Sequence, residues 1–264
     1  MMQSALINVM SAAAIKAGKG LLRDFGEVDN LQVSRKGAHS FVTSADIRTE
    51  KLLQRELSKA RPAYGFMMEE TGEIEGTDPT HRWIVDPLDG TSNFIHAIPY
   101  FCISIGVEKK TASGSQIIAG VIYDPIHNEL FSAEQYAGAF LNNRRLVTAG
   151  RENLSDAMLV CSGPKHMASR SEKEIEVFGK LTNSGACIRR LGATALDLAH
   201  IAAGRVDGGF YDMIQPWDIA AGSLMVQEAG GQIVDFSGKT ATLDSRTLIA
   251  SSRALSPALA RLSA

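Results

Sequence analysis

Two aspartates and a glycine directly follow an apolar run in residues 83–94, Trp-Ile-Val-Asp-Pro-Leu-Asp-Gly-Thr-Ser-Asn-Phe. The apolar part predicts a buried strand that ends on Asp86, where Pro87 stops further strand pairing, and open α/β sheets bind ligands at such strand ends. Asp86 and Asp89 lie across a tight turn, so both carboxylates can converge on one cation, and the Leu88 carbonyl adds another hard oxygen. This set of oxygen ligands suits Mg²⁺.

The residues that follow Asp89 are suited to hold a phosphate group. Gly90 lets the backbone approach a ligand, and Thr91 is predicted to cap a short helix closed by Pro99, so that backbone N–H groups remain free for phosphate oxygens. For an isolated D-x-x-D-G pattern, an ordinary Asx turn is the competing interpretation. The rest of the chain must therefore decide between a metal site and a simple turn.

A second motif near the C-terminus separates these two interpretations. Residues 86–94 resemble the first signature of the inositol monophosphatase family, whose members are Mg²⁺-dependent, Li⁺-sensitive phosphatases. Residues 216–231, Pro-Trp-Asp-Ile-Ala-Ala-Gly-Ser-Leu-Met-Val-Gln-Glu-Ala-Gly-Gly, resemble the family's C-terminal signature and follow in the right order and at the right distance. The resemblance spans nearly the whole chain. It implies an α+β or α/β fold, the layered αβαβα sandwich of the inositol monophosphatase and fructose-1,6-bisphosphatase type.

The resemblance also implies which residues bind metal and which position the attacking water. The implied metal ligands are Glu69, Asp86, the Leu88 carbonyl, Asp89 and Asp218. The residues implied to orient the water are Glu69 and the pair formed by Asp46 and Thr91.

Each of these acids also has an ordinary structural explanation. Asp46 lies in the first turn of a helix that Thr43 or Ser44 caps, so it could simply face the helix dipole. Glu69 belongs to a glutamate pair of the kind that is usually solvated. Asp218 lies at the start of a helix, where an acid serves as an N-terminal cap. The two signatures together favour the metal and water roles.

The residues expected to contact the substrate differ in part from those usual in inositol-selective members of the family. The resemblance implies that the residues in contact with substrate are Asp89, Gly90, Thr91, Arg189, Gly192, Ala193, Thr194, Asp212 and Asp218. Arg189 matches a basic residue at the mouth of the site or at a dimer contact. Tyr211 stands where inositol-selective relatives usually carry Glu, and the adjacent Asp212 is the residue that can replace it. Ser40 is another departure, because family members commonly carry Asp there.

Four carboxylates in one cleft require cations. Like charges about 4 Å apart repel by roughly 4 kcal/mol per pair at an effective dielectric constant near 20. We therefore expect two or three Mg²⁺ ions per site, which bind phosphate oxygens, acidify a water and stabilise the leaving alkoxide. The expected activity is hydrolysis of a small phosphate monoester, first of all inositol 1-phosphate. Histidinol phosphate, fructose 1,6-bisphosphate and nucleotides such as 3′-phosphoadenosine phosphate or NADP are alternatives. A transcription-complex protein that retains the fold is the alternative from another class.

The elements that must position these residues change character near Gly150. An apolar stripe over residues 6–22 predicts a helix, a second helix reaches about residue 60, residues 64–68 form a short strand, and residues 72–81 read as a polar, turn-rich flap. Strands over 101–107, 117–123 and 130–133 fit an antiparallel sheet, and residues 137–147 fit a hairpin that turns at Asn142 and Asn143.

Strands and helices alternate in the second half. Strands are expected over 158–162, 187–191 and 206–211, and helices over 170–181, 194–203 and 217–229, which indicates an α/β layer. The two halves are assigned as domains 1–150 and 151–264. Asp197 and Asp207 are interpreted as structural, and His200 as a buried or half-buried histidine without a catalytic role.

Composition restricts the classes of function. Of 264 residues 45% are hydrophobic, which suffices for a sizeable core, and a net charge of −2 argues against a protein built for nucleic acid or anionic membranes. Three widely spaced cysteines, Cys102, Cys161 and Cys187, indicate free thiols in a reducing compartment, so we expect a cytoplasmic protein.

The N-terminus lacks the features of a membrane signal. Its basic residues come after its apolar part, unlike those of a signal peptide, and no window approaches the roughly 18 apolar residues of a spanning helix. The expected partners are a small phosphorylated substrate and a second copy in a homodimer. The sequence alone gives no support to a contact with the transcription machinery.

Overall fold

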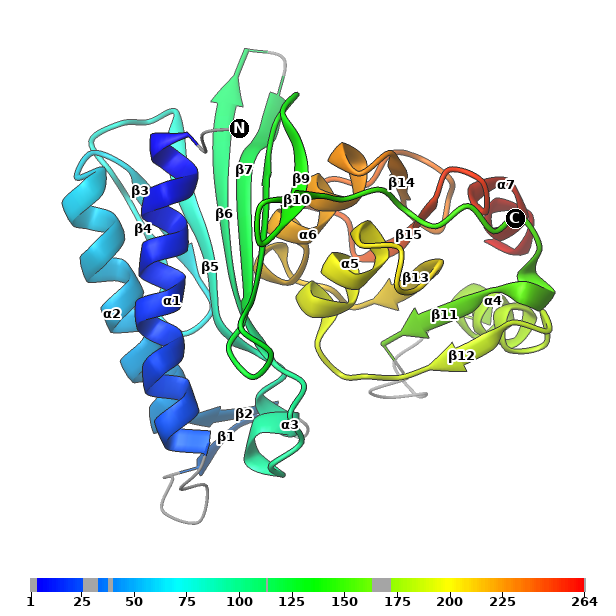
Figure 1. The fold of residues 1–264 in the computed structure, drawn as a ribbon, viewed down its shortest axis with the longest axis horizontal. Helices are drawn as coiled ribbons and strands as arrows, with labels where there is room; N and C mark the ends of the chain where they lie inside the picture. Colours follow the sequence, from blue (N-terminus) through cyan, green and yellow to red (C-terminus); the bar gives the residue numbers. More distant parts are fainter. Residues whose placement is uncertain (1–3, 26–32, 38–39, 113, 163–171, 264) are drawn as a thin grey trace.

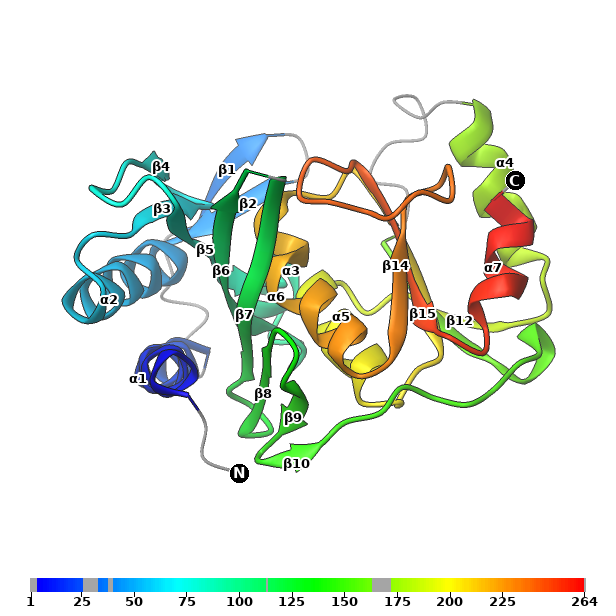
Figure 2. The ribbon, with the colours of Figure 1, turned by 90° about the horizontal axis from the view of Figure 1, so that it is seen from above.

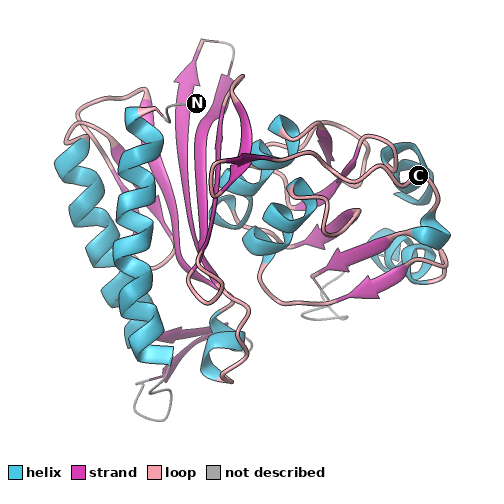
Figure 3. Ribbon diagram, in the orientation of Figure 1, coloured by secondary structure: helices cyan, strands magenta, loops and turns pink. Residues whose placement is uncertain are grey.

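Helix layers and mixed β-sheets alternate along the long axis of the molecule (Figures 1 and 3). The computed structural model describes residues 4–25, 33–37, 40–112, 114–162 and 172–263. One helix pair covers an eight-stranded sheet, a second pair lies between the two sheets, and a third covers a five-stranded sheet. In that order, the helices are α1 (Ala5–Phe25) and α2 (Ser44–Ala60), α5 (Thr194–Ala202) and α6 (Pro216–Glu228), and α4 (Glu172–Thr182) and α7 (Ser256–Ser263). The predicted layered αβαβα sandwich is confirmed.

The eight-stranded sheet belongs entirely to the first half of the chain. In spatial order its strands are β10 (Arg144–Arg145), β9 (Gly138–Leu141), β8 (Glu129–Glu134), β7 (Gly114–Asp124), β6 (Cys102–Thr111), β5 (His81–Asp89), β3 (Gly65–Met68) and β4 (Gly72–Ile74). All neighbours are antiparallel except β3 and β5. The predicted hairpin is confirmed, since Asn142 and Asn143 both have positive φ between β9 and β10, as tight hairpin turns require.

The predicted flap over 72–81 is in part a strand. Residues 72–74 form β4, which pairs with β3, so this part of the segment belongs to the edge of the sheet. Its polar composition misled the prediction, because an edge strand keeps one side in solvent and needs few apolar residues.

Helices α1 and α2 bury their apolar stripes against one face of this sheet. Met10, Ala14 and Leu21 of α1 are fully buried, in one cluster with residues of β5, β6 and β7. By length and composition alone α1 would suffice to cross a membrane, contrary to the expectation from the sequence. Its packing is that of a core helix of a globular protein.

The ribbon β1 (Val33–Gly37) and β2 (Ser40–Thr43) leads directly into α2, which begins with a capping box. Thr43 is the N-cap, as predicted, and Asp46 completes the box. The side chain of Ser40 is outside the described part of the structure.

The five-stranded sheet is formed by the second half. In spatial order its strands are β12 (Cys187–Arg189), β11 (Met158–Cys161), β13 (Gly208–Asp212), β15 (Thr247–Ser252) and β14 (Gly231–Val234). A short 3₁₀ helix, η2 (Leu154–Asp156), precedes β11. The predicted strands and helices up to α6 are found, with α4 beginning at Glu172 because residues 170–171 lie outside the described part. The predicted boundary at Gly150 falls between β10 and β11, and the division into two domains stays a prediction.

Helix α6 joins the two sheets, as seen from above in Figure 2. It lies very close to β6 and β7, where a Cβ on Gly120 would be 2.8 Å from Ala221 Cα. Only glycine permits this approach. Because Asp218 is on α6 and Asp86 is on the neighbouring β5, the close packing of α6 brings the two signatures together.

Candidate active site

A cavity of about 360 Å³ lies where the end of β5 meets the beginnings of α5 and α6. Its acidic lining residues are Glu69, Asp86, Asp89, Asp197, Asp212 and Asp218. Among the described residues, its single basic lining residue is Arg190. The cavity therefore gathers all four predicted carboxylate ligands from two distant parts of the chain, in a strongly acidic environment.

The end of β5 differs from the prediction at Pro87. The strand does not end there: its pairing with β6 is interrupted after Asp86 and resumes at Asp89, which lies opposite Cys102. Pro87 lacks an N–H group, and it lies in the irregularity, as prolines within sheets commonly do. The Asp86 side chain accepts a hydrogen bond from the Leu88 amide at 3.0 Å. Both aspartates are buried and border the cavity.

Thr91 is not the helix cap that the sequence predicted. Helix α3 (Thr91–Ile95) has Gly90 as its N-cap, with φ of 94°, and a Cβ there would be 3.0 Å from the Tyr100 carbonyl oxygen. Glycine tolerates this left-handed conformation, which explains why the threonine is displaced into the first helical position. The Thr91 hydroxyl instead lies 3.2 Å from Asp46 Oδ1 and 3.0 Å from the Leu88 carbonyl oxygen.

Asp46 makes the contacts that both interpretations of the sequence require. Its Oδ2 atom accepts hydrogen bonds from the Thr43 amide at 2.8 Å and the Thr43 hydroxyl at 2.5 Å, while Oδ1 faces Thr91. Burial raises the pKa of Asp46, the Thr43 hydrogen bonds oppose this increase, and the charge of Glu69 adds to it. The cap thus holds the carboxylate in place, and the second oxygen reaches the predicted partner.

Glu69 lies in the turn after β3, and hydrogen bonds to α2 hold this turn in place. The Glu50 carboxylate, which is buried on α2, accepts hydrogen bonds from the Glu70 amide at 2.8 Å and from the Thr71 hydroxyl at 2.5 Å. Glu69 borders the cavity and Glu70 does not, as the family pattern implied.

Helices α5 and α6 complete the site from the second half. Asp218 is the third residue of α6, and its Oδ2 atom accepts a hydrogen bond from the Gln215 amide at 2.8 Å, so it is a cap as well as a cavity residue. Asp89 Oδ2 accepts a hydrogen bond from the Ala195 amide at 2.6 Å. Backbone amides at the start of α5 therefore hold a carboxylate of the first half.

The electrostatics of this cluster favour a cation. Burial raises the pKa of Asp86 well above its usual range, and the charges of Glu69, Asp89 and Asp218 raise it further. Burial, then the charge of Asp218, raises the pKa of Asp89 to about 7, although backbone amides oppose the increase. These groups repel one another, and a positive ion between them would remove the repulsion.

The donor chemistry fits Mg²⁺. Asp86, Asp89 and Asp218 each accept a hydrogen bond from a backbone amide, and carboxylate oxygens are the hard ligands that Mg²⁺ prefers. Within the described part of the chain, no three acidic, histidine or cysteine side chains are already placed around one ion position.

Eight of the nine residues predicted to contact substrate line the cavity, and their role in binding stays a prediction. Gly192, Ala193, Thr194 and Asp212 border the cavity. Arg189 does not: its guanidinium group contacts Cys187 Sγ and the Ile188 carbonyl oxygen, each at 3.0 Å, and Arg190 occupies the cavity rim. Arg189 is the last residue of β12 and Arg190 follows it, and adjacent residues along an extended chain point to opposite sides.

Tyr211 is excluded from substrate contact because it is buried in the core between the sheets. Asp212 faces the cavity, and Ser162 holds it there: the Ser162 hydroxyl accepts from the Asp212 amide at 3.1 Å and donates to its carboxylate at 3.2 Å.

The sequence-based prediction missed nine of the described residues that line the cavity, which are Ser92, Asn93, Cys161, Ser162, Arg190, Leu191, Asp197, Met213 and Ile214. Asn93 lies within the first signature, and this was the signal that could have identified it. Asp197 was interpreted as structural, and it does accept a hydrogen bond from Tyr100, but it also borders the cavity. Asp207 is structural as predicted, since it binds Arg151 and the Met158 amide.

Known proteins match this chain along its full length. The model of the inositol monophosphatase family matches residues 2–264. An inositol-1-monophosphatase of Mesorhizobium japonicum is 48% identical over 98% of this chain and 96% of its own length. The Nus factor SuhB of Escherichia coli is 42% identical over 88% of this chain and 86% of its own length. The crystal structure of the extragenic suppressor protein suhB from Bartonella henselae superposes with a TM-score of 0.93, at 46% identity and 98% coverage of both chains.

Proposed function

We propose that this chain, which belongs to the inositol monophosphatase family and is a phosphoric monoester hydrolase, hydrolyses inositol 1-phosphate with the help of Mg²⁺. The observation that carries this proposal is the cavity in which Asp86 and Asp89 have raised pKa values because they are buried beside other acids. Without cations this cluster would repel a phosphate. With them, it becomes a phosphate-binding site.

The residues that would hold the ions are Glu69, Asp86, Asp89, Asp218 and the Leu88 carbonyl, with two or three Mg²⁺ ions per site. When bound, Mg²⁺ supplies Lewis acidity toward phosphate oxygens and acidifies water. The hydrogen bonds from backbone amides to the three aspartates orient these carboxylates, in the way that outer partners orient the ligands of other metal sites.

Thr91 and Asp46 would position the attacking water together with Glu69. A hydroxyl has one hydrogen to donate and two lone pairs to accept with. When the Thr91 hydroxyl donates to Asp46, a lone pair of its oxygen remains available to accept a hydrogen from water. Asp46 cannot rotate away, because Thr43 holds its other oxygen.

The alcohol part of the substrate would lie against the second half of the chain. Asp89 and Asp218 border this region, the Gly90 and Thr91 amides would steady the phosphoryl group, and the residues 192–194 line the opposite wall. Asp212 would accept hydrogen bonds from sugar hydroxyls in place of the glutamate usual at Tyr211. The position of Arg190 at the rim supports attraction of an anionic substrate, whereas Arg189 lacks such support.

A panel of phosphate monoesters tests the proposal. We would measure kcat/KM for inositol 1-phosphate, histidinol phosphate, fructose 1,6-bisphosphate and 3′-phosphoadenosine phosphate, with Asp86→Asn as an inactive variant and Asp78→Asn as a matched control. Asp78 is an acid outside the cavity, bonded to Thr80 and His81. We expect inositol 1-phosphate to lead by at least about tenfold. A tenfold preference for another ester would show that this ester, and not inositol 1-phosphate, is the preferred substrate. If wild type releases no more phosphate than Asp86→Asn, the proposed reaction is refuted.

A role in transcription complexes is the second candidate, and the name of the Escherichia coli relative, Nus factor, favours it. The test is retention of the purified protein on RNA polymerase, compared between wild type and Asp86→Asn. Retention of both proteins would support a role independent of catalysis, and retention of neither would reject it.

We also propose that the protein acts in the cytoplasm as a homodimer. Cys102, Cys161 and Cys187 form no disulfide bond in the described part of the chain, which is consistent with a reducing compartment. Sedimentation at several concentrations tests the dimer, which a single monomer-sized species would exclude.

A further inference from the structure

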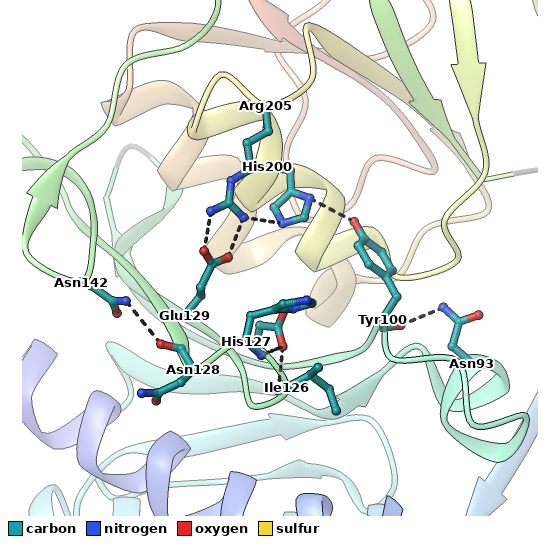
Figure 4. Close-up of polar contacts among 10 residues, drawn as sticks. Asn93, Tyr100, Ile126, His127, Asn128, Glu129, Asn142, His200 and Arg205 are labelled. Atoms are coloured by element: carbon teal, nitrogen blue, oxygen red, sulfur yellow. Dashed lines mark hydrogen bonds and ion pairs between the residues drawn. The ribbon is translucent and has the colours of Figure 1, made fainter.

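Tyr100 connects the two halves of the chain, and Figure 4 shows it between Asn93 and His200. It is not among the described residues that line the cavity. It lies just before β6. Its hydroxyl donates to Asp197 Oδ1 at 2.7 Å, and its backbone carbonyl accepts a hydrogen bond from Asn93 Nδ2 at 2.8 Å. The same Asn93 nitrogen donates to the Leu191 carbonyl oxygen at 2.8 Å. Tyr100 therefore contacts α3 through its backbone and α5 through its side chain.

On α5, the residue that Tyr100 contacts lies close to a hydrogen bond that holds Asp89, a predicted metal ligand. Asp197 lies in the first turn of α5, and the Ala195 amide of the same turn donates to Asp89 Oδ2 at 2.6 Å. A displacement of this turn would change the hydrogen bond that orients Asp89. Asp197 is fully buried, and burial raises the pKa of its carboxyl group well above the usual range, while the hydrogen bond from Tyr100 opposes this increase.

On its other side, Tyr100 is reached by a chain of hydrogen bonds from the surface. Arg205 binds Glu129 through two hydrogen bonds of 2.5 Å, and its Nη1 atom also lies 3.1 Å from His200 Nε2. His200 Nδ1 in turn lies 3.4 Å from the Tyr100 hydroxyl oxygen. Figure 4 shows these side chains in one continuous row between the β7–β8 turn and α5.

The donors and acceptors give this series of hydrogen bonds a single direction. Burial lowers the pKa of His200 to about 4, so its ring is neutral at pH 7. Because Arg205 can only donate, Nε2 must accept, and the ring hydrogen is on Nδ1. Nδ1 then donates to the Tyr100 oxygen. Burial raises the pKa of Tyr100, so its hydroxyl keeps the hydrogen that it donates to Asp197.

We propose that Tyr100 is a positioning residue of the reaction: the directed chain from Arg205 through His200 and Tyr100 to Asp197 fixes the first turn of α5, and this turn orients Asp89. The inference rests on the proposed metal site for its link to catalysis. The hydrogen bonds themselves do not depend on it.

Tyr100→Phe tests the proposal, because it removes only the hydroxyl. We would measure binding of Mn²⁺ by electron paramagnetic resonance without substrate, and then kcat and KM with the best monoester of the panel. We expect Mn²⁺ to bind about tenfold more weakly and kcat to fall about tenfold, the lower end of the range for lost outer partners of metal ligands, with KM nearly unchanged. Unchanged Mn²⁺ affinity together with an unchanged kcat would overturn the proposal.

Tyr123→Phe is the matched control. Tyr123 is a tyrosine on the neighbouring strand β7, and its hydroxyl donates at 3.0 Å to Oδ1 of Asn128, a residue of the turn between β7 and β8. Tyr100→Phe loses the hydroxyl hydrogen bonds to Asp197 and His200, and Tyr123→Phe loses the one to Asn128, so both variants should melt at lower temperature. A purely structural role of Tyr100 predicts the same Mn²⁺ affinity for the two variants, and our proposal predicts a loss in Tyr100→Phe alone.

A second pair of variants covers the case in which Tyr100→Phe does not fold. His200→Ala removes the donor to Tyr100, and we expect a several-fold weaker Mn²⁺ affinity. His200→Asn places an amide nitrogen near the position of Nδ1, and we expect it to recover most of that loss. Equal Mn²⁺ affinities of the two His200 variants would contradict the proposed series of hydrogen bonds from Arg205 to Asp197. If wild type binds Mn²⁺ but hydrolyses none of the esters, the proposed function fails, while the binding measurements still decide the role of Tyr100.

Discussion

Thr91→Ala is expected to lower kcat about a hundredfold while the fold stays nearly intact. Thr91 is not the N-cap of α3, so its removal costs one partly buried hydrogen bond, about 1 kcal/mol of unfolding free energy. Loss of a group that handles the proton of the attacking water lowers the rate about 10²-fold, which corresponds to about 2.7 kcal/mol in the barrier. The two effects are therefore separable by measuring both stability and turnover.

Asp46→Asn separates the cap of α2 from the orientation of water. Both donors of Thr43 end on Oδ2 of Asp46, so the amide oxygen of asparagine can accept them and keep the capping box. Its NH₂ group then faces Thr91 and replaces an acceptor by a donor. We expect kcat to fall about 10²-fold in this variant as well, and the double variant to be hardly worse than either single variant, because the two residues act as one unit.

The assay is the initial rate of phosphate release at saturating substrate and Mg²⁺, with the thermal midpoint and Mn²⁺ affinity measured on the same preparations. Thr91→Ser is the matched control, since it retains the hydroxyl and should stay near wild type. Losses that multiply in the double variant, to about 10⁴-fold, would show that Thr91 and Asp46 act separately. A Thr91→Ala enzyme within threefold of wild type would refute the role and leave Glu69 as the water-orienting group.

Three further predictions follow from the charges of the structure. Asp89→Asn should lower turnover at least about a hundredfold through loss of a metal ligand, and a rate within threefold of wild type would exclude Asp89 from the site. Activity should require Mg²⁺ and be inhibited by Li⁺, so full activity in a chelator would contradict the oxygen-ligand site. His200 has its folded-state pKa lowered to about 4 from a usual 6.5, so its contribution to stability is fully present above pH 6.5 and is lost as pH falls toward 4. Urea unfolding at pH 7 and pH 4.5 should show wild type losing of order 2 kcal/mol more than His200→Gln, and equal losses would reject this cause.

Local patterns in the sequence predicted most of the elements, because each pattern records a local requirement. The alternation of strands and turns over residues 101–147, the stripe of α1 and the Thr43 cap are found in the structure. Strands β14 and β15 and helix α7 were not predicted. They lie after the second signature, in a segment with frequent polar residues, and they are stabilised by pairing with β13 and by packing on α4.

The errors at the site arose where a distant contact overrides a local preference. Thr91 is a good cap by residue type, but the approach of Tyr100 to Gly90 places the left-handed residue one position earlier. Pro87 usually ends a strand, but β6 continues alongside and resumes pairing at Asp89. Arg190 and Ser162 reach the cavity only because β12, β11 and β13 are adjacent in the second sheet. None of these contacts is encoded by neighbouring residues.

The site requires both halves of the chain for a physical reason. The aspartates of β5 are buried beside one another, and this is unfavourable for their charged forms. The fold opposes this with backbone amides: Ala195 on α5 donates to Asp89 from the other half of the chain, and Gln215 before α6 donates to the nearby Asp218. These hydrogen bonds stabilise the charged forms of the two carboxylates. A chain that kept the first signature but lost the packing of α5 and α6 would retain the repulsion without the orientation, so the motif alone would neither bind metal tightly nor catalyse.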